Sequence, residues 1–247
     1  MQIKDSVVFI TGANRGLGLA FAKAALAAGA KKVYGAARDA ASITLSGVTP
    51  VALDVTKPAQ VEAAAAACGD VTLLINNAGI SRGALLLGSA DAFDAARAEF
   101  ETNFFGMWSV ARAFAPVLKA NGGGAILNVL SVAGIVAVPN MGGYSPSKFA
   151  MRAAGSCIRA ELAGQGTSVT SLIVGSVDTR MASHVKGAKE APEDIARAAM
   201  KGITRGVDEI DTDRFAIESR AALARDPKGM ERGMAKMLHA QELSTGR

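Results

Sequence analysis

The chain has 247 residues, of which 50% are hydrophobic, and a formal net charge of +5. Such a chain can bury the core of one ordinary α/β domain, so no second domain is required, and no apolar run approaches the ~18 residues of a membrane span. The basic residues are scattered among acidic ones instead of forming a run, which argues against nucleic-acid binding.

Targeting and metal-binding signals are absent from the sequence pattern. The first five residues lack the basic region and long apolar core of a signal peptide, so we expect a cytoplasmic protein. Cys68 and Cys157 fit that compartment, since neither lies in a C-x-x-C pair and only two histidines could join them around a metal. We therefore expect no metal site, and we expect both cysteines to be small core residues.

The first element is an apolar stretch at residues 6–11, which predicts a buried strand. It runs into a glycine-rich turn, and residues 17–28 predict an Ala- and Leu-rich helix. This order is typical of a nucleotide-binding unit, in which glycines let the backbone approach phosphates at the helix N-terminus. The spacing of Gly12, Gly16 and Gly18 differs from the G-x-G-x-x-G fingerprint, and a tight turn without a ligand would also use glycines.

Further along the chain, apolar runs of strand length alternate with Ala-rich helical stretches. This pattern predicts an α/β fold, with a Rossmann-type doubly wound parallel sheet of about seven strands in three α/β/α layers. Pro58 and Gly69 mark an alanine run as one helix, whereas residues 38–48 leave room for only a turn or two. We expect the strands near residues 6–11, 32–37, 49–53, 71–76, 124–130, 168–174 and 208–212.

Tyr144 and Lys148 are spaced to lie one turn apart on one helix face, where an ammonium group can stabilise a phenolate. An unperturbed tyrosine, with a pKa of about 10, needs such help to transfer protons near neutrality. A helix starting near Gly143 would add its positive end. Taken alone, such a pair is more often part of a solvated surface.

Taken together, the motifs resemble the short-chain dehydrogenase/reductase family in its single-domain form, over residues 6 to about 205. They stand in the family's order: Thr11-Gly-x-x-x-Gly-x-Gly18, Asp54, Asn76-Asn-Ala-Gly79, Asn103, Ser131, Tyr144-x-x-x-Lys148, and the segment from Gly175 to Thr179. The resemblance implies one dinucleotide-binding and catalytic domain over residues 1–247, with a substrate lid around 178–192 and a C-terminal helical segment at 213–240. It also implies a homodimer or homotetramer, paired through helices near 91–119 and 143–164.

The activity that the resemblance implies is hydride transfer between a nicotinamide cofactor and the carbon of a ketone, aldehyde or alcohol (CH-OH) group. Tyr144 would be the general acid or base, and Ser131 would hydrogen-bond the substrate oxygen. Lys148 would lower the tyrosine pKa and bind the nicotinamide ribose, while Asn103 would hold a proton-relay water to that lysine. Leu130 replaces a serine that is common in the family.

The cofactor residues are also carried over by position. Asp54 and Val55 would contact the adenine, the turn at 76–79 would lie beside its ribose, and Thr179 would bind the carboxamide. Val174 replaces the family's usual proline before Gly175, a change that favours a looser loop at the nicotinamide contacts. The expected cofactor set is Gly12, Asn14, Arg15, Gly16, Leu17, Gly18, Arg38, Asp54, Val55, Asn77, Ala78, Gly79, Tyr144, Lys148, Gly175, Val177 and Thr179.

Charge at the end of the second strand indicates the choice of cofactor, because a ribose 2′-hydroxyl favours a carboxylate and a 2′-phosphate favours arginine. That strand ends in Arg38, and Arg15 lies within the glycine turn. Two guanidinium groups can clamp one phosphate, so we expect NADP(H) to be preferred over NAD(H). The neighbouring Asp39 could instead turn toward the ribose.

The loops expected to form the substrate pocket are apolar and favour a hydrophobic ketone or secondary alcohol. His184, in the expected lid, could touch the substrate or be an ordinary surface residue. A dinucleotide-binding sensor or interaction protein without turnover remains an alternative, as does an epimerase or dehydratase of the same fold. The expected pocket residues are Leu85, Leu86, Leu87, Val136, Val138, Met141, Val174 and Met181.

Overall fold

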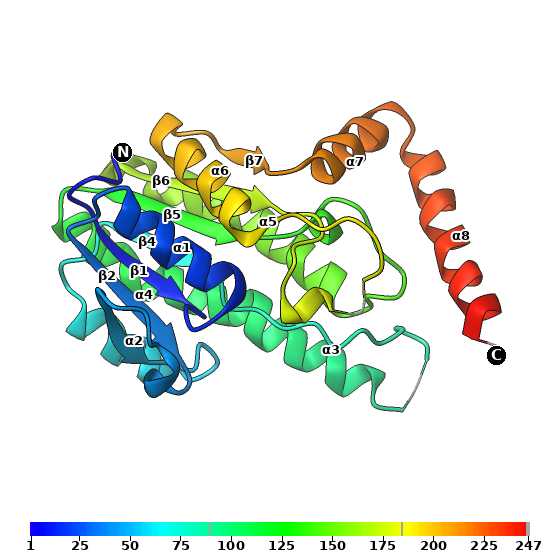
Figure 1. Ribbon diagram of the computed structural model, residues 1–247, viewed down its shortest axis with the longest axis horizontal. Coiled ribbons are helices and arrows are strands. Elements are labelled where there is room, and N and C mark those ends of the chain that lie inside the picture. The colour runs from blue at the N-terminus through cyan, green and yellow to red at the C-terminus, as the bar shows by residue number, and fades with distance from the viewer. Residues whose placement is uncertain (89, 184, 246–247) are drawn as a thin grey trace.

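A parallel sheet of seven strands runs through the middle of the molecule, and helices cover both of its faces (Figure 1). The computed structural model describes residues 1–88, 90–183 and 185–245. Each expected strand is present, with bounds that differ by at most two residues. In spatial order, the strands are β3 (Val48–Ala52), β2 (Lys32–Ala37), β1 (Val7–Thr11), β4 (Leu73–Asn76), β5 (Gly124–Val129), β6 (Thr167–Ile173) and β7 (Glu209–Asp211).

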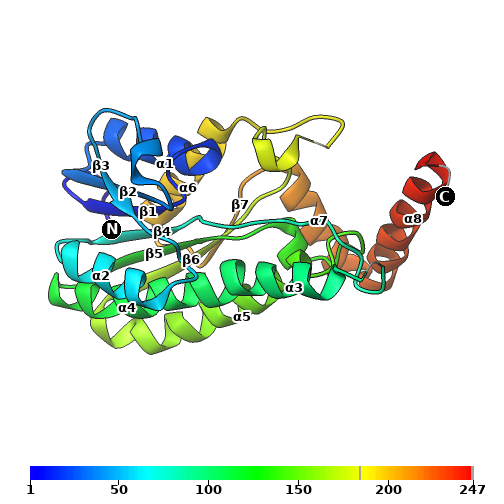
Figure 2. The same ribbon diagram turned by 90° about the horizontal axis from the view of Figure 1, so that it is seen from below.

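The helices form the two outer layers of the predicted α/β/α arrangement, which is confirmed. Seen along the sheet, α1 (Gly16–Ala27) and α6 (Pro192–Arg205) lie on one face (Figure 2). The opposite face carries α2 (Pro58–Ala67), α4 (Met107–Ala120) and α5 (Tyr144–Leu162). The region at 38–48 is reduced, as expected, to one short 3-10 helix, η1 (Ala40–Ser42).

Three further helices lie toward the end of the sheet at which the strands terminate. A π-helical segment, η2 (Glu101–Gly106), joins α3 (Ala92–Phe100) directly to α4. The C-terminal part contains α7 (Arg214–Arg225) and α8 (Pro227–Thr245), and α8 projects away from the rest of the molecule (Figure 1). The described residues contain no helix that is long and apolar enough to cross a membrane.

The sheet is held by hydrophobic contacts on both faces. Val8 and Ile10 of β1 pack in a core with Ile195 of α6. Phe9, between them in sequence, points to the other face and stacks on Phe114 of α4, with ring centroids 4.6 Å apart. Continuous burial of β1 explains why it reads as an uninterrupted apolar run, as expected for a parallel strand covered on both sides.

The order of the strands reverses between β1 and β4, because the chain continues from β1 toward β2 and β3 and then returns to β4 on the other side. In open α/β sheets, ligands bind in the crevice at the carboxyl ends of the strands at such a point. The glycine turn follows β1, and the turn at 76–79 begins at the end of β4. Both predicted cofactor segments therefore lie at the switch point.

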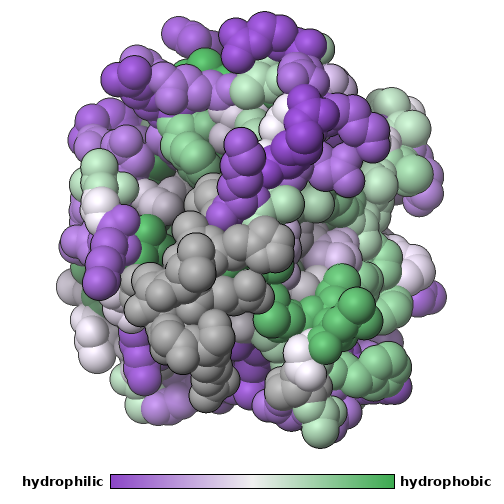
Figure 3. Space-filling model, turned by 90° about the vertical axis from the view of Figure 1, so that its right-hand side faces the viewer, coloured by the Kyte–Doolittle hydropathy of each residue, from purple (hydrophilic) through white to green (hydrophobic). Residues whose placement is uncertain are grey.

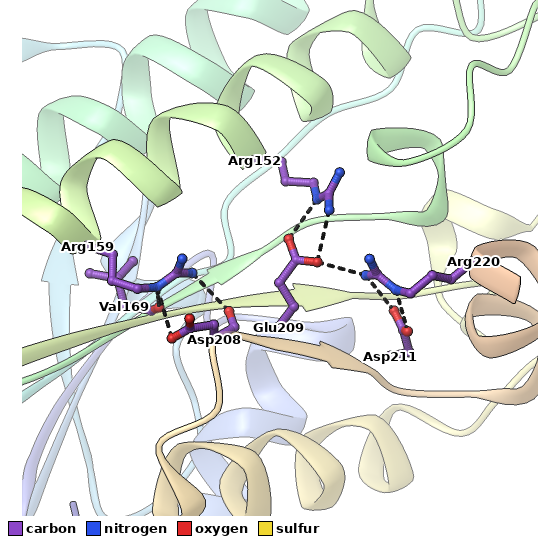
Figure 4. A network of polar contacts seen from close by, with 7 residues as sticks. All are labelled: Arg152, Arg159, Val169, Asp208, Glu209, Asp211 and Arg220. Carbon is purple, nitrogen blue, oxygen red and sulfur yellow. Dashed lines mark hydrogen bonds and ion pairs between the residues drawn. The ribbon is translucent and has the colours of Figure 1, made fainter. Parts of the chain in front are cut away.

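The edge strand β7 is fixed to its neighbours by charged side chains (Figure 4). Glu209 accepts two hydrogen bonds from Arg152 of α5, at 2.7 and 3.0 Å, and also pairs with Arg220 of α7 at 2.9 Å. Arg220 forms a second bidentate pair with Asp211. Bidentate arginine–carboxylate pairs are directional, so this network fixes α7 relative to β7 and α5.

The two cysteines differ from the prediction that both lie in the core. Cys68 is buried at the end of α2, and burial raises the pKa of its thiol to about 11. Cys157 is exposed, because its position in α5 faces away from the sheet. The prediction is therefore correct for Cys68 and wrong for Cys157.

Candidate active site

The turn after β1 has the backbone shape of a phosphate cradle. Gly12 and Gly16 adopt left-handed backbone angles, with φ of 67° and 53°, which favour glycine. A Cβ at Gly18 would overlap the carbonyl oxygen of Gly12 and lie 2.7 Å from Nδ2 of Asn77. The helix α1 begins without a side-chain cap, so its first amide groups remain available to an anion. Asn14 and Leu17 are half-buried within the same turn.

Asn77 and Ala78 tie this turn to the end of β4. Both backbone amides donate to Oγ1 of Thr11 at 2.9 Å, and Nδ2 of Asn77 donates to the Thr11 carbonyl at 2.8 Å. The Thr179 side chain lies against Gly16 on the other side of the turn. The structure thus brings together three predicted cofactor segments that are far apart in the sequence.

The end of β2 presents positive charge to solvent. Arg15 and Arg38 are exposed, and neither forms an ion pair with another described residue. Asp39, which could have turned toward a ribose, instead accepts a hydrogen bond from the Ala41 amide at 3.0 Å and caps η1. These segments therefore present two exposed guanidinium groups and the exposed, partly bonded carboxylate of Asp39.

Asp54 and Val55 follow β3 but differ in their surroundings. Oδ1 of Asp54 accepts hydrogen bonds from the amide and hydroxyl of Thr56, at 3.0 and 2.8 Å. Burial raises the pKa of Asp54, but these bonds and the charge of Arg38 outweigh burial and lower it. The Val55 side chain is buried in the core and packs against Gly106.

Ser131, Tyr144 and Lys148 meet where β5 ends and α5 begins. Ser131 follows β5, and its Oγ accepts a hydrogen bond from the Ala133 amide at 3.1 Å. Tyr144 is the first residue of α5, and Lys148 lies one turn further along. The Lys148 side chain is 3% exposed, and its Nζ donates to the Val129 carbonyl at 2.9 Å. That Nζ lies 5.7 Å from the centre of the Tyr144 ring.

The pKa shifts of this group follow mainly from burial. Burial raises the pKa of Tyr144, a hydrogen bond with Ser131 opposes this, and the charge of Glu99 raises it further. Burial lowers the pKa of Lys148 from its ordinary 10.5 to about 8. Lys148 is not among the groups that shift the pKa of Tyr144 here, so the expected lowering of the tyrosine pKa by Lys148 stays a prediction.

Asn103 lies in the π-helical segment and is fully buried. Its Oδ1 accepts from the Ile80 amide and its Nδ2 donates to the Ile80 carbonyl, both at 2.9 Å. Nδ2 also donates to Oγ of Ser147 at 3.1 Å. A Cβ at Gly79 would lie 3.2 Å from Oδ1 of Asn103 and 3.6 Å from Nζ of Lys148. Asn103 thus holds the loop after β4 beside the lysine.

Asp213 is a site residue that the sequence analysis missed. Gly175, predicted to contact the nicotinamide, donates its amide to Oδ2 of Asp213 at 2.8 Å. Oδ1 of the same carboxylate accepts from the Ala216 amide and caps α7. Asp213 therefore anchors the loop after β6, in which Val174 replaces the usual proline. An aspartate before a helix looks like an ordinary cap in the sequence, so nothing marked this second role.

Contacts join the two ends of the segment expected to act as a lid. Asp178 donates its amide to the Glu190 carbonyl at 2.9 Å, and Lys189 pairs with Asp178 at 3.4 Å. Val177 is buried and bridges to Glu190. His184 lies outside the described residues, so its expected role stays open. The function of residues 178–192 as a lid remains a prediction.

The residues predicted to form the substrate pocket divide into three groups, of which Val138 and Met141 are half-buried. Val136 and Val174 are buried in the hydrophobic core, so they support the site without being free to line it. By contrast, Leu86 is 62% exposed and Leu87 fully exposed, with Leu85 and Met181 also exposed. Figure 3 views the molecule from the end toward which the strands run, and hydrophobic side chains gather there beside hydrophilic ones.

The buried ammonium group of Lys148 predicts a specific dependence of stability on pH. Since its pKa is about 8 in the folded chain and 10.5 when exposed, the unfolded chain binds more protons between these values, and folding becomes more favourable as the pH rises. At pH 7, without nucleotide, Lys148→Met should raise the free energy of unfolding by about 3 kcal/mol relative to the native chain. Chemical denaturation at pH 7 and pH 10 should show this difference shrinking. A constant difference would contradict a buried, charged Lys148.

Comparisons with known proteins agree with this geometry. A family model described as short chain dehydrogenase matches residues 6–190. A 3-alpha-(or 20-beta)-hydroxysteroid dehydrogenase of Mycobacterium tuberculosis is 33% identical over 81% of this chain and 77% of its own length. A 2-(S)-hydroxypropyl-CoM dehydrogenase of Xanthobacter autotrophicus is also 33% identical, over 81% of this chain and 83% of its own.

Solved structures show the same relationship. A short chain dehydrogenase of Burkholderia cenocepacia in complex with NADP has a TM-score of 0.91 and 40% identity, covering 95% of this chain and 99% of its own. A short chain dehydrogenase/reductase of Burkholderia phymatum in complex with NAD has a TM-score of 0.81 and 26% identity, covering 92% and 96%. With the matching family model, the shared fold and the motifs at the switch point, the chain belongs to the short-chain dehydrogenase/reductase family of oxidoreductases.

Proposed function

We propose that the protein is an NADP(H)-dependent carbonyl reductase or alcohol dehydrogenase, in which Tyr144 is the general acid and base. The observation that carries this proposal is the meeting of Ser131, Tyr144 and Lys148 beside the glycine turn. The turn fits a dinucleotide, because its glycines leave no side chain over the open end of α1.

When bound, the nicotinamide supplies or accepts the hydride at the carbonyl carbon. For reduction, the chain must supply a proton to the carbonyl oxygen. The Ser131 hydroxyl orients that oxygen, and Tyr144 donates its phenolic proton. Lys148 would hold the nicotinamide ribose, and its positive charge favours the phenolate left after proton transfer. Asn103 holds the loop after β4, and Gly79 leaves space between that loop and Lys148, where the expected proton relay would lie. Oxidation of an alcohol reverses these steps.

The exposed guanidinium groups of Arg15 and Arg38 support a preference for NADP(H). One oxygen of the exposed Asp39 carboxylate is engaged in the η1 cap, whereas neither arginine is paired with a described acidic residue, which supports a phosphate at this site over an unphosphorylated ribose. The Burkholderia cenocepacia relative was solved with NADP, whereas the Burkholderia phymatum relative was solved with NAD. Of these two relatives, the one with the higher identity was therefore solved with the cofactor that the charges of Arg15 and Arg38 favour.

Replacing both arginines should remove this preference. We expect Arg15→Ala with Arg38→Ala to weaken NADPH binding by about 10- to 100-fold, since charge-assisted hydrogen bonds contribute about 1.5–3 kcal/mol, and to leave NADH binding nearly unchanged. Fluorescence titration with both nucleotides measures this ratio. Arg112→Ala, an exposed arginine on α4, is the control for lost positive charge. An unchanged ratio in the double variant would refute the assignment.

For the substrate, we propose a hydrophobic ketone or secondary alcohol. Leu85, Leu86, Leu87 and Met181 expose apolar surface on the loops expected around the site. One relative is named a hydroxysteroid dehydrogenase, which fits this class, and another is named a 2-(S)-hydroxypropyl-CoM dehydrogenase. Residues 178–192, whose two ends are joined by the ion pair between Lys189 and Asp178, would act as the lid.

Turnover with a carbonyl panel tests the function. NADPH oxidation by hydrophobic and polar ketones should be detectable for the native protein and should fall by about 100- to 10,000-fold in Tyr144→Phe, because the general acid is lost. Tyr34→Phe is a matched control, since Tyr34 is the only other tyrosine in the chain. Tight NADPH binding without turnover on any member of the panel would favour a non-catalytic sensor or another reaction class.

We further propose that the protein forms a homodimer or homotetramer. Phe105 and Trp108 are each 45% exposed near the junction of η2 and α4, and Phe149 of α5 is also exposed. Exposed aromatic groups on long helices are favourable contacts between subunits. Light scattering after size exclusion should give a mass of about two or four chains, and Trp108→Glu should lower it. A monomeric native protein would exclude this proposal.

A further inference from the structure

Glu99 is a buried carboxylate close to Tyr144 that the proposed reaction does not use. It lies on α3 and is 1% exposed. Its Oε1 accepts a hydrogen bond from the Arg82 amide at 2.6 Å, while its Oε2 has no hydrogen-bond partner among the described residues. Burial of an incompletely paired carboxylate is unfavourable, so its place here calls for a physical reason.

Glu99 and Asn103 act on the same loop from neighbouring turns of one continuous helix. Asn103 binds both backbone groups of Ile80, and Glu99 binds the amide of Arg82. From the other side, the amide of Gly142 donates to the Ala84 carbonyl at 2.8 Å. The loop after β4 is therefore held between α3 and the residues that lead into α5.

Direct packing connects Glu99 to the start of α5. A Cβ on Gly143 would overlap both the backbone of Ala96 and Oε2 of Glu99. Gly143 immediately precedes Tyr144, so the unpaired carboxylate oxygen faces the backbone from which the tyrosine projects. Only glycine lets α3 and α5 approach this closely without a shift in the neighbouring groups.

The charged groups around Tyr144 come from three elements. Glu99 on α3 contributes a negative charge, Lys148 on α5 a positive charge, and Arg82 in the loop a positive charge that faces Glu99. The charge of Glu99 disfavours the phenolate form of Tyr144. The Nζ of Lys148 donates to the Val129 carbonyl and lies 5.7 Å from the centre of the Tyr144 ring, so its positive charge opposes the effect of Glu99 on the tyrosine.

We propose that Glu99 is a positioning residue that holds the loop after β4 against α5 and keeps Tyr144 in its proton-donating form. This inference rests on the proposed function, because a proton-donating tyrosine matters for carbonyl chemistry. Its consequence is a bias of the site toward reduction near neutral pH, since alcohol oxidation requires the phenolate. Glu99 acts through Tyr144 and need not touch the substrate.

The test uses the fact that the chain contains only two tyrosines. Tyrosine labelled with carbon-13 at Cζ gives two resonances, and Tyr34→Phe assigns the one that belongs to Tyr144. We expect Glu99→Gln to move the Tyr144 titration midpoint to lower pH, while its amide oxygen still accepts from Arg82. Glu101→Gln is the matched control, because Glu101 is exposed two residues away and loses the same charge. If Glu99→Gln does not fold, Glu99→Met removes the charge with an apolar side chain of similar length.

The same variants separate this inference from the proposed function. With an active enzyme, the pH profile of alcohol oxidation should shift to lower pH in Glu99→Gln and stay in place in Glu101→Gln. An unchanged Tyr144 midpoint in Glu99→Gln and Glu99→Met would overturn the inference, whether or not the protein turns over substrate. A native protein without turnover would instead refute the proposed function, and the titration would still decide whether Glu99 acts on Tyr144.

Discussion

The close approach between the turn after β1 and the end of β4 determines the geometry of the whole site. Gly18 must lack a side chain because the Gly12 carbonyl and the Asn77 amide occupy the space where a Cβ would lie. Thr11 then connects the two strand ends by accepting three hydrogen bonds, two from Asn77 and one from Ala78. The residues after Asn77 continue to Gly79, which lies against Asn103 and Lys148. The same close approach therefore also positions the cofactor cradle relative to the proton-transfer group.

Burial of two ionisable side chains in this site is unfavourable in free energy, and favourable contacts around the site offset this. Lys148 and Glu99 are both nearly inaccessible to water, and burial shifts each toward its neutral form. Around them, the α5 helix packs on β6 and the Arg152–Glu209–Arg220 network fixes β7 and α7 (Figure 4). Asp213, just before α7, accepts a hydrogen bond from the Gly175 amide and so fixes that loop relative to α7. The charged groups are thus held by a scaffold built largely from the second half of the chain.

Much of the fold could be predicted because the local signals were strong. Buried parallel strands such as β1 are uninterrupted apolar runs, and the pairs Tyr144–Lys148 and Gly16–Gly18 have spacings that local geometry fixes. The sequence could not show that Asp213 binds Gly175 or that Glu99 faces Gly143, because these contacts join segments through the tertiary fold. Charged residues in an amphipathic helix also look alike whether buried or exposed, as Glu99 and Glu101 illustrate. Apolar loop residues have the same problem: the sequence could not distinguish the buried Val136 and Val174 from the exposed Leu87.

The central claim is that Tyr144 and the glycine turn together bring about hydride transfer from a nicotinamide to a carbonyl carbon. The most direct measurement uses NADPH carrying deuterium on the transferable position of nicotinamide C4, with mass spectrometry of the product alcohol. The account predicts that the native protein places the deuterium on the carbon that bore the carbonyl oxygen, and that Tyr144→Phe forms almost no labelled product. Alcohol that forms without the label, or NADPH that binds and keeps its deuterium in the presence of every carbonyl tested, would contradict it.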